Sequence, residues 1–204
     1  MIVIINYGLG NIQAFVNVYE DLHIPVKVAK SASGLTGATK FILPGVGAFD
    51  RAMQSFNDSG MLAEVERLVL IEKIPILGIC VGMQMLANVS DEGQKQGLGW
   101  ISGKVRTFTS NIDSAGLPSP HMGWNNVVLL NGNPLFKDLS GGARFYFLHS
   151  YFFDCTDTEQ SIATTNYGLD FCCAVANKNI YGVQFHPEKS HHFGVQLLKN
   201  FAEL

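Results

Sequence analysis

The sequence carries little charge and no excess of basic residues. Charged side chains make up 15% of its 204 residues, and 17 acidic against 14 basic side chains give a formal net charge of −3. Proteins that hold nucleic acid or an anionic membrane electrostatically carry an excess or a cluster of Lys and Arg. The composition therefore argues against both partners and favours chemistry on a small molecule.

Cysteine pairs and long apolar runs are also missing. The four cysteines have no C-x-x-C spacing, the chain opens on a strand-like run instead of a signal peptide, and the longest apolar tract, 68–89, is interrupted by Glu72, Lys73 and Pro75. A membrane-spanning helix needs about 20 predominantly apolar residues. We therefore expect a cytoplasmic protein whose cysteines are reduced.

Hydrophobic residues, in contrast, are abundant. They make up 47% of the chain, which is enough for a sizeable core, and no stretch has the composition of a linker. We expect a single domain over residues 1–204.

Strand-like and helix-like segments alternate in the first half of the chain. Apolar runs predict strands at 1–6, 26–29, 40–43 and 74–80, and helical periodicity predicts helices at 12–22, 61–71 and 83–89. This alternation is typical of an α/β fold with a mostly parallel central sheet and flanking helices. The second half adds short strands, expected to pair antiparallel, before a final helix: 101–108, 124–130, 144–152, 161–165, 171–176 and 180–185, then 194–201.

The run Gly-Ile-Cys-Val-Gly at 78–82 places Cys80 between an apolar strand and a helix. Glycines on either side suit a sharp strand-to-helix turn in which neighbouring chains leave no room for a Cβ atom. The helix that follows would direct its N–H groups toward the sulfur and favour the thiolate. A buried structural cysteine is the alternative interpretation.

Two other strands also end in glycine-rich turns. The first strand is followed by a turn that exposes Asn11, and the third by Pro-Gly-Val-Gly at 44–47. Sites in parallel sheets form outside the carboxyl ends of strands, so Asn11, Val46 and Cys80 are expected at one edge. Glycines around Val46 would let a peptide rotate, as an oxyanion hole near a nucleophile requires. A plain connecting loop is the alternative.

A cysteine nucleophile needs a base that a third group orients. His186 follows the apolar strand at 180–185 and has Glu188 two residues on, which supplies both groups. His149 is a second candidate, and His121, His191 and His192 compete by residue type alone.

Together these motifs resemble the class I (triad) glutamine amidotransferases over essentially the whole chain. The resemblance rests on 78–84 and 185–188, and the motifs at 44–47, 120–125 and 186–190 bring it closest to the family of glutaminase subunits of imidazole glycerol phosphate synthase. It implies that Cys80 attacks the side-chain amide of glutamine, that His186 carries the proton to ammonia, and that Glu188 orients His186.

The resemblance also implies the other roles, without metal or cofactor. By their positions in the family's motifs, the residues that match the oxyanion hole are Val46, Gly47 and Val81. Those that match the glutamine pocket are Gln84, Glu92, His149, Ser150 and Tyr151. Those that match the partner-facing surface are Asn11, Tyr146 and Lys189. The expected partner is a (β/α)8-barrel cyclase subunit in a heterodimer. It would receive the ammonia for a step of histidine biosynthesis.

Some positions depart from the family pattern. Asn6 stands where the family usually has aspartate. The family also usually has a glycine soon after Glu-Lys-Ser, where this chain has His191-His192-Phe193. These departures resemble paralogues that supply ammonia, with a cyclase-like partner, for acetamidino-sugar formation in surface polysaccharide (O-antigen). A non-catalytic α/β binding module and a cysteine peptidase are the remaining alternatives, and the intact trio of Cys80, His186 and Glu188 argues against the module.

Overall fold

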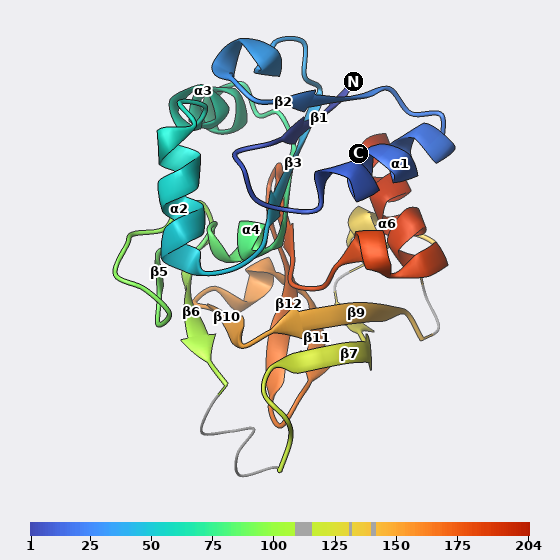
Figure 1. The fold of residues 1–204 in the computed structure, drawn as a ribbon. Coiled ribbons are helices and arrows are strands. Elements are labelled where there is room, and N and C mark those ends of the chain that lie inside the picture. The colour runs from blue at the N-terminus through green and yellow to red at the C-terminus, as the bar shows by residue number, and fades with distance from the viewer. Residues whose placement is uncertain (109–115, 131, 140–141) are drawn as a thin grey trace.

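The computed structural model describes residues 1–108, 116–130, 132–139 and 142–204. Two layers of helices flank a central sheet (Figure 1). α1 (Ile12–Asp21) and α6 (His191–Glu203) cover one face, and α2 (Phe49–Asp58) and α3 (Leu62–Glu66) cover the other. The α/β class expected from the sequence is confirmed.

The described residues form one sheet of 11 strands and a separate pair. Across the large sheet, neighbours run in this order: β2 (Val26–Ala29), β1 (Ile2–Ile5), β3 (Lys40–Gly45), β4 (Ile76–Cys80), β13 (Ile180–Val183), β12 (Asp170–Asn177), β10 (Tyr151–Cys155), β6 (Gly103–Thr107) and β5 (Val89–Ser90). β11 (Ser161–Asn166) joins β12, and β8 (Val128–Leu129) joins β11. The ladders from β2 to β13 are parallel, and β13–β12, β12–β10 and β10–β6 are antiparallel.

The apolar runs explain the parallel half. Every residue of β1 and β4 is buried, as expected for strands covered on both faces. In the β3–β4 register Gly45 lies opposite Cys80, and in the β13–β4 register Val183 lies opposite Ile79. The carboxyl ends of these three strands therefore meet at one edge, where the site forms.

Two predicted strands are wrong because each divides between two sheets. The segment predicted at 124–130 contains β7 (His121–Asn126) and β8, and that at 144–152 contains β9 (Arg144–His149) and the start of β10. β7 and β9 pair only with each other among the described residues. The chain turns at Ser150, whose carbonyl accepts from the Phe108 N–H, and continues in the large sheet.

Two predicted helices have different bounds. The helix predicted at 83–89 is α4 (Val81–Gln84), after which β5 begins at Val89. The carbonyls of Leu86 and Ala87 accept from N–H groups at 99–101, and these bonds take the place of further helical turns. The helix predicted at 194–201 begins earlier, so His191-His192-Phe193 forms the first turn of α6.

The other two predicted helices match: the helix expected at 12–22 is α1, and the helix expected at 61–71 forms with one irregularity. The expected helix at 61–71 consists of α3 and a π-helical turn, η2 (Arg67–Ile71). None of the helices in the described part of the chain has the length and apolar character that crossing a membrane requires.

Candidate active site

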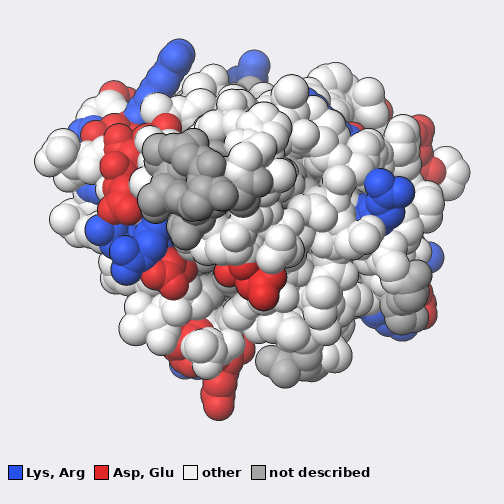
Figure 2. All heavy atoms as spheres, turned by 90° about the horizontal axis from the view of Figure 1, so that it is seen from below, with Lys and Arg blue, Asp and Glu red and all other residues white. Residues whose placement is uncertain are grey.

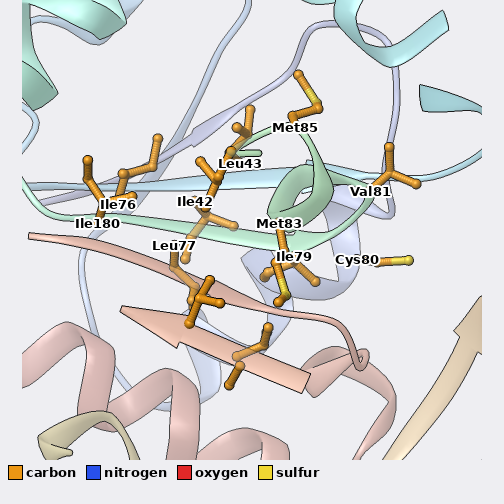
Figure 3. Packing of buried hydrophobic residues seen from close by; sticks show 14 of the residues in the cluster. Ile42, Leu43, Ile76, Leu77, Ile79, Cys80, Val81, Met83, Met85 and Ile180 are labelled. Atoms are coloured by element: carbon orange, nitrogen blue, oxygen red, sulfur yellow. The ribbon is translucent and has the colours of Figure 1, made fainter. Parts of the chain in front are cut away.

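Cys80 occupies the sharp turn between β4 and α4. Its backbone has φ 56° and ψ −113°, a conformation that side-chain-bearing residues rarely adopt outside functional sites. A Cβ on Gly78 would lie 2.5 Å from the carbonyl oxygen of Gly82, and one on Gly82 would overlap the carbonyl of Leu43. The predicted crowding is confirmed. Figure 3 shows the Cys80 side chain pointing away from the apolar residues that pack around β4.

A pocket of about 310 Å³ opens at this edge of the sheet, beside Cys80. Eleven of the residues singled out from the sequence line it: Val46, Gly47, Cys80, Val81, Gln84, Glu92, His149, Ser150, Tyr151, His186 and Lys189. They come from segments far apart in the chain. Pro120 and Leu148 complete the lining.

His186 and Glu188 form a buried pair next to Cys80. Nδ1 of His186 lies 2.9 Å from Oε1 of Glu188, and the side chains are only 6% and 2% exposed. The His186 backbone N–H donates to the carbonyl of Tyr146 in β9, and Ser190 Oγ donates to the His186 carbonyl. The backbone therefore holds the imidazole between the carboxylate and the sulfur.

The environment of His186 favours its protonated form. Burial lowers the pKa of His186, but hydrogen bonds to Cys80 and Glu188 and the charges of these two groups outweigh that effect and raise the pKa to about 10. The folded value lies above the ordinary one. The interaction therefore stabilises the fold fully below about pH 6.5, and this contribution is lost as the pH rises through about 10.

His149 and His121 have a different environment. His149 Nδ1 lies 2.7 Å from the Tyr151 carbonyl oxygen, and its Nε2 lies 3.0 Å from Nδ1 of His121. Burial lowers the pKa of His121 to about 4 and is the main cause that lowers the pKa of His149 to about 3. Both rings are neutral at pH 7, and their nitrogens bond one another instead of Cys80.

The predicted oxyanion residues Val46, Gly47 and Val81 line the same pocket as Cys80. Gly45 packs so closely on the 81–82 peptide that a Cβ there would overlap the Gly82 nitrogen, while Val46 is 40% exposed and Gly47 has φ 84°. The 44–47 segment is therefore tightly packed at Gly45 and exposed to solvent at Val46. Glu92, which also lines the pocket, accepts a hydrogen bond from the Phe49 N–H at 2.9 Å, just beyond this segment.

Comparison with known proteins decides the family. The description "Glutamine amidotransferase class-I" matches residues 3–204 of the chain. The chain belongs to the class-I glutamine amidotransferases. This membership makes it a glutamine-hydrolysing enzyme.

Full-length relatives carry a more specific name. "Imidazole glycerol phosphate synthase subunit HisH" of Bdellovibrio bacteriovorus is 62% identical, and the protein of that name from Leptospira borgpetersenii is 50% identical, each with all of both chains covered. "Imidazole glycerol phosphate synthase subunit HisH 2" of Pseudomonas aeruginosa is 43% identical, again over both full chains.

Solved structures support the fold of this amidotransferase. A crystal structure described as a glutamine amidotransferase superposes with a TM-score of 0.76 at 19% identity, covering 99% of each chain. The Thermotoga maritima PurLQS structure gives 0.74 at 16% identity, covering 99% of this chain and 97% of that one.

Gln184 is a residue of the amidotransferase site that sequence reasoning missed. It is fully buried; its Oε1 accepts from Gln84 Nε2 at 3.0 Å, and its Nε2 lies 3.7 Å from Cys80 Sγ. Gln84 Nε2 also donates to the Tyr151 carbonyl at 3.2 Å, so the orientation of both amides is set by a backbone oxygen. The one available signal was its place two residues before His186.

The predicted partner-facing residues of this amidotransferase lie in two places. Lys189 lines the pocket, and its Nζ lies 5.7 Å from the centre of the Tyr146 ring. Asn11 is exposed where the chain leaves the β1 turn and enters α1, and it does not line the pocket.

Proposed function

We propose that the pocket hydrolyses glutamine to glutamate and ammonia with Cys80, His186 and Glu188 as a triad. The observation that carries this proposal is the buried His186–Glu188 pair beside a cysteine held at φ 56°. At pH 7 the His186 imidazolium, whose pKa is raised to about 10, already holds the proton that the Cys80 thiol gives up, and the sulfur attacks the side-chain amide carbon. His186 then gives this proton to the leaving nitrogen, and ammonia departs from a glutamyl thioester. The neutral His186 deprotonates water, which releases glutamate and restores the starting pair of Cys80 and protonated His186.

Backbone N–H groups of Val46, Gly47 and Val81 would stabilise the oxyanion that forms at the amide oxygen. Donors held in place for this charge contribute about 10²- to 10³-fold each to the rate. The open segment at Val46-Gly47 suits a donor that is completed only when a partner binds. The isolated chain is therefore a weak glutaminase in this proposal.

The other pocket residues would bind glutamine. The Glu92 carboxylate suits the α-ammonium group, because charge-assisted hydrogen bonds are strong. Gln84, His149, Ser150 and Tyr151 line the remaining wall. Purified chain with its partner should release one glutamate and one ammonia per glutamine consumed. If no glutamate appears under any condition, the proposal is wrong.

Gln184 would orient the Cys80 sulfur through its Nε2. Changing Gln184 to Met keeps the volume and removes the donor, so we expect kcat/KM for glutamine to fall about 10-fold, as for one lost hydrogen bond. Alkylation of Cys80 by iodoacetamide at pH 7 should slow by a similar factor. The exposed Gln13→Met is the matched control and should change neither rate. Unchanged alkylation and turnover in Gln184→Met would remove this role.

The acceptor of the ammonia would be the cyclase subunit of imidazole glycerol phosphate synthase, a (β/α)8 barrel that forms a heterodimer with this chain. The names of full-length relatives at 62% and 50% identity support this assignment. Histidine biosynthesis is then the pathway served. In this proposal residues 1–204 form one glutamine amidotransferase domain.

The surface beside the pocket suits such a partner. Met122 and Leu148 are register neighbours on β7 and β9 and are 63% and 37% exposed, Trp124 is 39% exposed, and Leu148 also lines the pocket. Figure 2 shows a broad uncharged area from the middle toward the right of the face seen from below, while most charged side chains lie on its left and an acidic group lies near its middle. Lys189 and Tyr146 would lie in this interface, with Asn11 nearer its edge.

The relatives do not favour the polysaccharide paralogue. Their names give the imidazole glycerol phosphate synthase subunit even at 43% identity. The His191-His192-Phe193 departure lies in the first turn of α6, where His191 stacks on Trp124 with ring centres 5.2 Å apart. A non-catalytic module is not supported either, because Cys80 and His186 line one pocket and Glu188 pairs with His186.

A further inference from the structure

Two cysteines outside the active site lie next to each other. The Cys155 thiol donates to the Cys172 sulfur, with the two Sγ atoms 3.4 Å apart. Cys155 ends β10 and Cys172 belongs to β12, the antiparallel neighbour of β10. Both are free thiols, and neither lines the glutamine pocket.

The local structure allows the two sulfurs to approach further. A disulfide bond is about 2.05 Å long, so they must close by about 1.4 Å. The β10–β12 ladder registers only Phe153 opposite Cys172, so Cys155 lies beyond the paired position, on the same face of the sheet. The end of β10 has no β12 ladder bonds, but Cys155 stays opposite Gly103 in the β10–β6 ladder, so the sulfurs must approach mainly by side-chain rotation. A bond across such diagonal positions is strained, which makes it easy to reduce.

The surroundings favour a redox pair over the other uses of two thiols. Among the described residues, no group of three His, Cys, Asp or Glu side chains could hold a metal ion. Cys155 is partly exposed and Cys172 is 8% exposed, so a small oxidant can reach the pair from the side of Cys155. The neighbouring Cys173 is fully buried and makes no sulfur contact of this kind.

We propose that Cys155 and Cys172 form a reversible disulfide when the chain meets a hydroperoxide. The Cys172 sulfur, which accepts the hydrogen bond from Cys155, loses its proton and attacks one oxygen of hydrogen peroxide; the O–O bond breaks and hydroxide leaves, giving a sulfenic acid. The deprotonated Cys155 sulfur then attacks the Cys172 sulfur, the S–O bond breaks, and a second hydroxide leaves. The two thiol protons convert both hydroxides to water. Two electrons pass from the thiols to the peroxide.

The test is a non-reducing peptide map of the full-length folded chain after treatment with hydrogen peroxide. Remaining thiols are blocked with N-ethylmaleimide before digestion. We expect a cross-linked peptide pair containing Cys155 and Cys172, lighter than the two separate peptides by two hydrogen atoms and absent after dithiothreitol. The Cys80→Ser chain serves as background, so that oxidation of the nucleophile does not enter the measurement.

Three further variants make the result decisive. Cys173→Ser, from the adjacent position, should keep the cross-link, whereas Cys155→Ser and Cys172→Ser should each lose it, with circular dichroism checking that each chain is folded. Should Cys155 and Cys172 both be recovered as N-ethylmaleimide adducts, or oxidise separately to sulfinic acids, the proposal is overturned. If either serine variant fails to fold, the map of the chain that keeps both cysteines decides between these outcomes by itself. Either result leaves the proposed glutaminase function untouched, because neither cysteine lines the pocket.

Discussion

The Cys80→Ser chain, assembled with its partner, is expected to lose at least ~10⁴-fold of its glutamine-dependent turnover while retaining turnover with added ammonium salt. A serine hydroxyl is a far weaker nucleophile than the thiol, and losing a triad nucleophile costs at least this much. The change replaces one sulfur atom in the pocket by oxygen and, in the proposed heterodimer, does not touch the acceptor chemistry of the partner. Product formation should be measured with glutamine and with ammonium as alternative nitrogen sources.

This comparison also separates catalysis from assembly. Loss of turnover with both nitrogen sources would mean that the variant no longer supports the partner, and Cys80→Ala would then repeat the test. Retained glutamate release in a folded Cys80→Ser chain would remove Cys80 from the mechanism.

The second large effect is expected at the buried pair. His186→Asn should lower kcat for glutamine hydrolysis by ~10⁴-fold, because no other group described beside Cys80 can move its proton. Glu188→Gln keeps a hydrogen-bond acceptor but removes the charge, so it should cost about 10- to 100-fold, the worth of one charge-assisted hydrogen bond. Initial rates of glutamate release from each variant with partner present give the order.

The exposed His192→Asn is the matched control for the histidine change and should keep full activity. Burial keeps His121 and His149 neutral and bonded to each other, so neither is expected to replace His186. A dispensable His186, with His121 or His149 substitutions abolishing turnover, would make the triad assignment wrong.

Local sequence patterns were sufficient for the strands β1 to β4 of the parallel half, although the helix α2 (Phe49–Asp58) was not predicted. Continuous apolar runs identify strands buried on both faces, and the two glycines around Cys80 predict the crowding seen against Gly82 and Leu43. These features depend on residues close together in the chain. The shared edge of β3 and β4 follows from parallel pairing alone. The expectation for 180–185 is only partly right, because β13 pairs antiparallel with β12 but parallel with β4, and the parallel ladder brings its end to the same edge.

The rest could not be predicted because it depends on partners distant in sequence. Nothing in the run 144–155 marks the turn at Ser150 that sends β9 and β10 into different sheets. The apolar spacing after Cys80 predicts a helix, but the carbonyls of Leu86 and Ala87 accept hydrogen bonds from the N–H groups of residues 99–101 instead. Gln184 gains its place in the site only through Gln84 and Tyr151, which lie 100 and 33 positions away in the chain.

The glutamine pocket shows the same limit. Its walls come from strand ends and turns between positions 46 and 189, and the residues assigned to it came from a family resemblance. The structure places those residues around one cavity. Their individual roles await the substitutions described above.

Glutamate release by the purified chain, measured with and without the histidine-pathway cyclase subunit of the same organism and its phosphoribosyl substrate, tests the central claim most directly. We expect the chain alone to turn over slowly and the complete mixture to be about 10²- to 10³-fold faster, the worth of one oxyanion donor completed by the partner. A cyclase paralogue from a polysaccharide cluster, tested in parallel, should give no stimulation. If the histidine-pathway cyclase does not raise the rate of glutamate release and the paralogue does, the assignment is contradicted.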